Sequence, residues 1–173
     1  LNGPVRMVAR DVLWRKIFPA QRSAADANFN ETAFNFLVDE KYALAAKLFK
    51  FASEFKGHSN EMVRRFIILN HAQALKWSGD ENGCIKILDD NDWSASTINL
   101  RIAERVLRND FVSALPMMAQ CTDSETIGKD GFRSWPVFRI FRQEPEFQNE
   151  YRRLFGEPLY EIDFKDEISA SLN

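Results

Sequence analysis

The stretch NHAQALKWSGDENGCIKIL, residues 70–88, decides the fold. A helical pattern of apolar residues runs into it from residue 59, and Gly79 is expected to end that helix. A second, shorter helix follows, with Cys84 and Leu88 four residues apart on its apolar side. The stretch therefore predicts two consecutive helices joined by a short turn that contains Gly79 and Asp80.

The same pattern recurs on both sides of this stretch. A small residue is followed by a larger one after four positions and by a small one after three more, in Ala45, Phe49 and Ala52 and in Ala114, Met118 and Cys121. Small side chains at these positions let the two helices of a pair cross closely. The first small residues of the three copies, Ala45, Cys84 and Ala114, are separated by 39 and 30 positions. Because no alternating strand pattern of useful length occurs, we expect an all-α fold of about three stacked antiparallel helix pairs.

This arrangement resembles the tetratricopeptide repeat, an α-solenoid family of stacked helix pairs. The resemblance covers residues 30–121. Its clearest copy is the segment 70–75 with Gly79, Asp80, Cys84 and Leu88. In the first copy, Ala33 and Phe36 precede Tyr42 and Ala45. In the third, Ala103 and Val106 precede Phe111 and Ala114, with a turn that we expect to be one residue shorter. Glu81 stands where the other two copies carry an aromatic residue.

The resemblance implies a groove lined by the first helix of each pair, in which a partner peptide or helix binds. The residues matching groove positions are Asn70, Gln73, Lys76, Arg101 and Glu104. Asn70 matches the asparagine with which the family grips a peptide backbone, whereas Leu100 stands where a second asparagine would be. An alternative role for Asn70 is a side-chain bond to neighbouring backbone. We expect a protein-binding module that needs no cofactor or metal.

Four segments are expected within one structural domain. Residues 1–29 form a basic helix, at 5–18, and a linker; 30–121 form the helix pairs, with Asn30 as a helix cap; 122–158 form capping helices; and 159–173 form an acidic tail. The segment 135–156 also resembles the closing segment of tetratricopeptide arrays, through Phe138, Phe141, Arg142, Pro145 and Phe147. Pro116 should kink the helix around it or delay its start.

The overall composition is that of a globular protein with a large aromatic core. The 173 residues include 15 Phe and 4 Trp, and the net charge of -2 gives no excess of positive charge to hold nucleic acid. Cys84 and Cys121 are expected to be reduced core residues. The sequence contains no run of about 18 apolar residues, so it predicts no membrane span. We expect a cytoplasmic protein. The opening Leu-Asn-Gly-Pro is not a translation start, so the chain is expected to be a fragment, a processed form or one with added residues before Met7.

One enzymatic alternative is concrete. Arg65 and His71, six residues apart on one helix, resemble the ribonuclease motif of helical HEPN proteins, which implies an arginine that binds phosphate and a histidine that transfers a proton. Phe66 stands where that family favours a polar residue. An ideal helix also turns the two side chains about 120° away from alignment. A histidine with its bonds satisfied in the helix is the alternative interpretation.

Two further clusters admit a functional and a structural interpretation. Asp89, Asp90 and Asp92 could bind a cation, but they lack the glycine and glutamate of a calcium loop, so a solvated turn is favoured. Arginines interleaved with aromatics at 133–153 could hold single-stranded nucleic acid. Because these aromatics recur at helical spacing, we expect them to form a core with arginines at its surface.

Overall fold

The computed structural model describes residues 24–54, 61–123 and 126–159. Within these ranges every regular element is helical and no strand occurs, which confirms the all-α prediction. The chain divides between Met117 and Met118 into two compact units. The predicted helix at 5–18 and the acidic tail beyond residue 159 lie outside the described residues.

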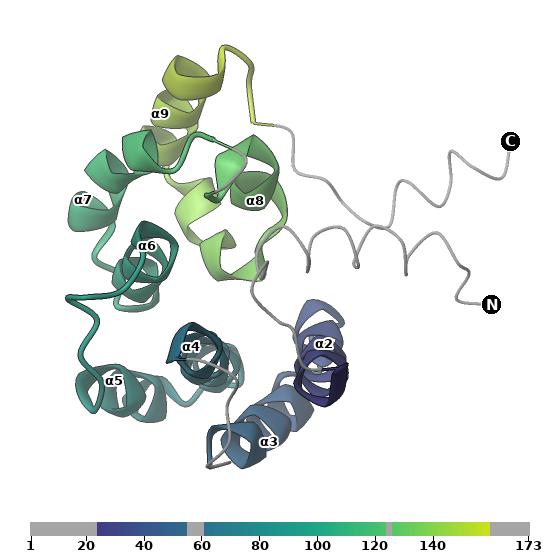
Figure 1. Cartoon of the computed structure of the whole chain (residues 1–173). Helices are drawn as coiled ribbons and strands as arrows, with labels where there is room; N and C mark the ends of the chain where they lie inside the picture. Colours follow the sequence, from purple (N-terminus) through teal and green to yellow (C-terminus); the bar gives the residue numbers. More distant parts are fainter. Residues whose placement is uncertain (1–23, 55–60, 124–125, 160–173) are drawn as a thin grey trace, which may run out of the picture. The chain divides into compact units, whose positions relative to one another are not determined.

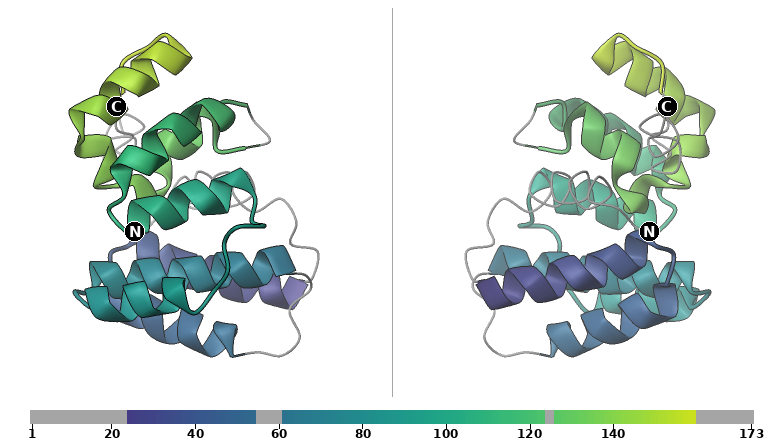
Figure 2. Two further views of the ribbon diagram at one scale, coloured as in Figure 1. Left: turned by 90° about the vertical axis from the view of Figure 1, so that its left-hand side faces the viewer. Right: turned by 90° about the vertical axis from the view of Figure 1, so that its right-hand side faces the viewer.

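The first unit consists of consecutive helices that pack in pairs (Figure 1). Its elements are α2 (Ala24–Val38), α3 (Tyr42–Ser53), α4 (Glu61–Trp77), α5 (Glu81–Asp89), α6 (Ile98–Leu107) and α7 (Phe111–Ala114). Helix α2 packs on α3, α4 on α5, and α6 on α7, while α4 also contacts α2, α3 and α6. Figure 2 shows α2 to α5 lying side by side with roughly aligned axes. Helix α4 is therefore the central helix of this unit.

The turns within the three pairs share one backbone geometry. Each contains one residue with a left-handed backbone: Glu40 (φ 61°), Gly79 (φ 94°) and Asn109 (φ 60°). The next N–H donates to the carbonyl oxygen five residues earlier, at N···O distances of 2.8 Å for Lys41, 2.9 Å for Asp80 and 2.9 Å for Asp110. This is the Schellman pattern, which satisfies the last carbonyl groups of a helix and reverses the chain.

The expectation of a shorter third turn is therefore wrong. Counted back from the left-handed residue, Ala33 and Ala72 stand seven positions before it, and the matching residue of the third pair is Ile102 rather than Ala103. Ile102 and Ala103 are both fully buried, so burial alone does not show which of them is equivalent to Ala33 and Ala72. The prediction failed because Ala103, as the small residue of this helix, was assumed to mark the point where the two helices cross.

The second helix of each pair begins directly after its turn. The Asp80 carboxylate accepts a hydrogen bond from Gly83 N at 2.8 Å, and the Asp110 carboxylate accepts one from Ser113 N at 3.2 Å. Aspartate at this position satisfies an N–H group that has no partner inside the helix. A Cβ atom on Gly83 would lie 2.4 Å from Asp80 Oδ2, so glycine leaves room for the first of these caps.

The small residues at the predicted crossings are buried. Ala45 and Ala114 have no exposed surface, and Cys84 is 1% exposed. After Ala114 the chain continues as the 3₁₀ helix η1 (Leu115–Gln120). Pro116 causes this change because it has no N–H group to continue the α-helical bonds.

Helix α2 starts earlier than the sequence analysis predicts. It begins at Ala24, so Asn30 lies inside the helix and is not its cap. The alanines at 24, 25 and 27 favour a helix where the sequence analysis assigned a linker. The side chain of Asn30 is only 2% exposed.

The second unit has an aromatic core. Its elements are α8 (Gly128–Ser134), the 3₁₀ helices η2 (Pro136–Phe138) and η3 (Phe141–Gln143), and α9 (Pro145–Phe155). The core side chains, each at most 1% exposed, are Phe132, Trp135, Phe138, Phe141, Phe147 and Tyr151. The buried Arg142 donates to the carbonyl oxygens of Phe132 at 3.2 Å and Trp135 at 3.0 Å, at the end of α8. Gly156 ends α9 with φ 72°.

No helix in the described ranges has the length and apolar character that a membrane crossing requires.

Candidate protein-binding surface

Asn70 lies in the middle of α4 and is buried. Every residue from Phe66 to Ala74 is buried, so this part of α4 is enclosed on all sides. The Asn70 side chain is 1% exposed, and its Oδ1 accepts no hydrogen bond from any described residue. A buried amide oxygen without a donor costs about 1 to 3 kcal/mol. Asn70 is thus a polar group whose bonding capacity the described fold does not use.

Two further asparagines share this property. Oδ1 of Asn30 in α2 and Oδ1 of Asn99 in α6 are also buried without a hydrogen-bond donor among the described residues. Counted from the left-handed turn residue, Asn30 and Asn99 stand ten positions before it and Asn70 stands nine before it. The first helix of every pair therefore carries one such oxygen, although the offset of one position turns Asn70 by about 100° from the direction shared by Asn30 and Asn99. The sequence analysis missed this set because it treated Asn30 as a cap and did not align the turns.

Lys76 is held inside the first unit. Its Nζ donates to the Leu107 carbonyl oxygen at 2.6 Å and to Asn109 Oδ1 at 2.6 Å. The side chain is 8% exposed, and burial lowers the pKa of its ammonium group. A cation at this place satisfies the C-terminal carbonyl groups of α6 and complements the helix dipole. Lys76 therefore joins α4 to the end of α6, and both bonds are made inside the protein.

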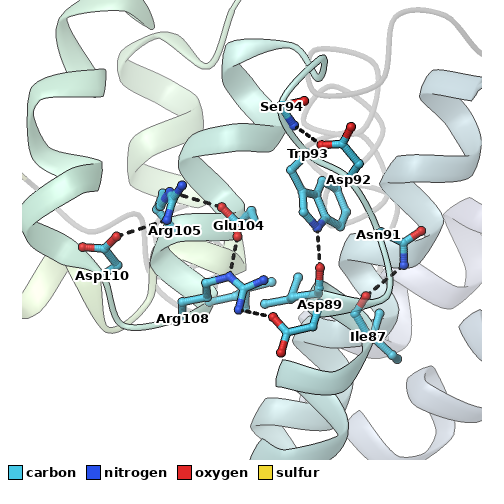
Figure 3. A network of polar contacts seen from close by, with 12 residues as sticks. Ile87, Asp89, Asn91, Asp92, Trp93, Ser94, Glu104, Arg105, Arg108 and Asp110 are labelled. Atoms are coloured by element: carbon cyan, nitrogen blue, oxygen red, sulfur yellow. Dashed lines mark hydrogen bonds and ion pairs between the residues drawn. The ribbon is translucent and has the colours of Figure 1, made fainter.

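Glu104 is likewise bonded within the fold, as Figure 3 shows. Its carboxylate accepts a hydrogen bond from Arg108 Nε and lies 3.4 Å from Arg105 Nε. Arg108 Nη1 in turn lies 2.6 Å from Asp89 Oδ1 at the end of α5. The Glu104 side chain is only 6% exposed, so this network joins the second helix pair to the third.

The other two predicted groove residues differ in exposure. Gln73 is fully buried in α4, whereas Arg101 is exposed on α6. Of the five groove candidates, Arg101 is the one that solvent reaches, while Asn70 is the buried one with an unused acceptor. Lys76 and Glu104 hold the helices of the unit together.

A small cavity of about 70 Å³ lies beside Lys76. It is lined by Lys76, Glu81, Cys84, Ile85, Leu107 and Asn109. Burial raises the pKa of the Cys84 thiol to about 11 and that of Cys121 to about 12. Both thiols are therefore protonated and unreactive near neutral pH, as expected for core cysteines.

Arg65 and His71 have different neighbours. Arg65 Nε donates to Glu61 at 2.9 Å, and its Nη1 donates to the Asp92 carbonyl oxygen at 2.8 Å and to Ser96 Oγ. Arg65 thus fastens the loop between α5 and α6 to α4. His71 is instead close enough to α3 for the charges of Lys50 and Glu54 to act on it. The two side chains share no hydrogen-bond partner among the described residues.

His71 predicts a pH dependence of stability. Burial lowers the pKa of His71, the Lys50 charge lowers it further, and the Glu54 charge raises it. The folded protein therefore favours neutral imidazole, and the unfolded chain binds more protons below about pH 6.5. We expect the free energy of unfolding to fall from pH 7.5 to pH 5, and to fall less in His71→Gln, which keeps His58. Urea unfolding curves at several pH values measure this; equal slopes for both proteins would contradict it.

The acidic turn and the aromatic cluster have structural roles. Asp89 pairs with Arg108, and Asp92 Oδ1 accepts a hydrogen bond from Ser94 N at 2.9 Å (Figure 3). Asp90 lies 2.7 Å from Lys86 Nζ. No group of three or more metal-binding side chains comes together in the described ranges. The aromatics Trp135, Phe138, Phe141, Phe147 and Tyr151 are buried, which confirms that they form a core.

Comparison with protein-family models, curated proteins and solved structures gave no match to this chain. The function must therefore be argued from the residues themselves.

Proposed function

We propose that this chain is a protein-interaction module of tetratricopeptide-like helix pairs, which binds a partner segment along the first helices α2, α4 and α6. Two observations support this arrangement of the helices. The three intra-pair turns share their left-handed residue and the hydrogen bond across five residues. The small residues after each turn, Ala45, Cys84 and Ala114, are buried. Equal turns and close crossings are what a stack of similar helix pairs requires.

The unpaired Oδ1 of Asn70 is the observation that carries the proposal. Buried polar groups in proteins nearly always have a hydrogen-bond partner, and exceptions call for an explanation. An oxygen acceptor is completed by an N–H donor, which every residue of a partner peptide except proline supplies. Asn30 and Asn99 offer the same acceptor on the neighbouring first helices. A partner segment that runs across α4 would meet the Asn70 oxygen, and the other two acceptors extend the same chemistry to α2 and α6.

The burial of Asn70 sets a condition on binding. With 1% of its surface exposed, the side chain meets a partner only after what covers it has moved. Association that requires such a change is slower than docking to a preformed surface. Arg101, which is already exposed, would make the first contact. Lys76 and Glu104 contribute by fixing the helices and do not touch the partner.

Capture of a partner from a lysate of the source organism tests this proposal. Wild-type protein and the variant Asn70→Leu are immobilised, and retained proteins are identified by mass spectrometry. We expect a partner whose affinity for the purified variant is about tenfold weaker, as the loss of one buried hydrogen bond predicts. Asn82→Leu, at an exposed asparagine of α5, is the matched control and should bind as wild type does. Equal binding of every captured protein to Asn70→Leu would exclude Asn70 from the interface.

A further inference from the structure

The outward face of α3 carries three apolar side chains. Leu44 and Phe51 are 42% and 56% exposed, and Leu48 between them is half-buried. Their spacing of four and three residues places them in one line along about two helical turns. The opposite face of α3, with Ala45 and Phe49, is buried in the first unit. We call Leu44, Leu48 and Phe51 the α3 stripe.

The charge around the α3 stripe has one sign. Lys47 and Lys50 are exposed on α3, and Lys41 is exposed immediately before it. Helix α3 contains no acidic residue, and neither Lys47 nor Lys50 forms an ion pair among the described residues. Acidic side chains occur only beyond its two ends, as in Glu40 and Glu54. The exposed surface of α3 therefore combines an apolar line with positive charge along its length.

We propose that the α3 stripe docks an acidic amphipathic helix of a partner protein. Two helices pack when a line of side chains on one fits between those of the other, and a two-turn line matches a short helical partner. The partner would present apolar residues at the same spacing of four and three. Glutamate or aspartate beside them would approach Lys47 and Lys50, which adds specificity and speeds association.

The dimensions of the stripe favour a helix over an anionic membrane. Three apolar residues over eight positions span roughly 10 Å of helix, much less than the apolar face of a helix that lies in a membrane surface. Glu40 and Glu54 at the two ends would repel anionic lipids. A short partner helix would lie beside Lys47 and Lys50, and Glu40 and Glu54 would limit an acidic partner to about the length of the stripe. The contact is small, so the docking is transient. It is also independent of Asn70, which lies on α4.

The test uses a fluorescent synthetic helix of alanine and glutamate with leucine at the matching spacing, and fluorescence anisotropy with the full chain. We expect saturable binding that weakens at least tenfold in Phe51→Ala and in the double variant Lys47→Glu, Lys50→Glu. A peptide with lysine in place of glutamate should bind the double variant better than wild type. The exposed Lys86→Glu on α5 is the control and should bind as wild type does. Circular dichroism checks that each variant is folded.

Three results would overturn the proposal. The first is no binding of the acidic peptide to wild type. The second is equal binding of the acidic and the lysine peptide, which would exclude charge recognition. The third is binding of phosphatidylserine vesicles that is lost with the same lysine substitutions while the peptide is unaffected, which would assign the stripe to a membrane. Asn70→Leu should bind the acidic peptide as tightly as wild type, so this test is separate from that of the proposed partner site.

Discussion

Replacing Lys76 with methionine is expected to lower the free energy of unfolding by about 2 to 3 kcal/mol. The substitution keeps most of the side-chain volume but removes both bonds of Nζ, to the Leu107 carbonyl oxygen and to Asn109 Oδ1. The Leu107 oxygen is at the C-terminus of α6 and would lose its charged partner. Burial of the ammonium group already disfavours its charge, which limits the loss.

Lys86→Met is the matched control for this prediction. Lys86 forms an exposed ion pair with Asp90 at the end of α5, and because solvent screens such a pair, its loss should change the free energy of unfolding little. Chemical unfolding followed by circular dichroism compares the two variants. If Lys76→Met were as stable as Lys86→Met, Lys76 would not be fastening α6, and its place in the groove would have to be reconsidered.

Replacing Ala45 with leucine is expected to destabilise the protein by about 2 kcal/mol. Ala45 has no exposed surface and lies on the side of α3 that packs against α2 and α4. Three added carbon atoms have no space there and would push the helices apart. Ala43→Leu is the matched control, because it adds the same three carbon atoms at a solvent-exposed position of the same helix. It should leave the free energy of unfolding within about 0.5 kcal/mol of wild type.

Thermal unfolding of the two leucine variants distinguishes close crossing from simple burial. A lower midpoint for Ala45→Leu and an unchanged one for Ala43→Leu are expected. Wild-type stability in Ala45→Leu would mean that the helices of the first pair do not touch at Ala45, and the argument from small residues would lose its physical basis.

The features that could be predicted from the sequence are those that local chemistry determines. Gly79 ends α4 because its φ of 94° disfavours other residues, and Asp80 caps α5 because its carboxylate reaches the first turn. The burial of Ala45 and Cys84 follows from the helical periodicity of their neighbours. Each of these can be recognised within a few residues of the chain.

The features that the sequence did not reveal depend on contacts between distant segments. Lys76 and Glu104 stand at sequence positions that match a groove, but in the structure their side chains bond to Asn109 and Arg108 within the fold. Nothing near Lys76 in the sequence indicates that the end of α6 will lie beside it. The equality of the three turns was hidden as well, because Glu40 and Asn109 adopt the left-handed conformation that glycine marks at position 79.

The most direct test of the account is the free energy of unfolding of Asn70→Leu, because the proposed function requires that Asn70 has no partner inside the protein. Leucine has a similar shape and no acceptor to leave unpaired, so we predict that the variant is more stable than wild type by about 1 kcal/mol. A loss of 1 kcal/mol or more would show that Asn70 is bonded within the fold, and would contradict its assignment to a partner.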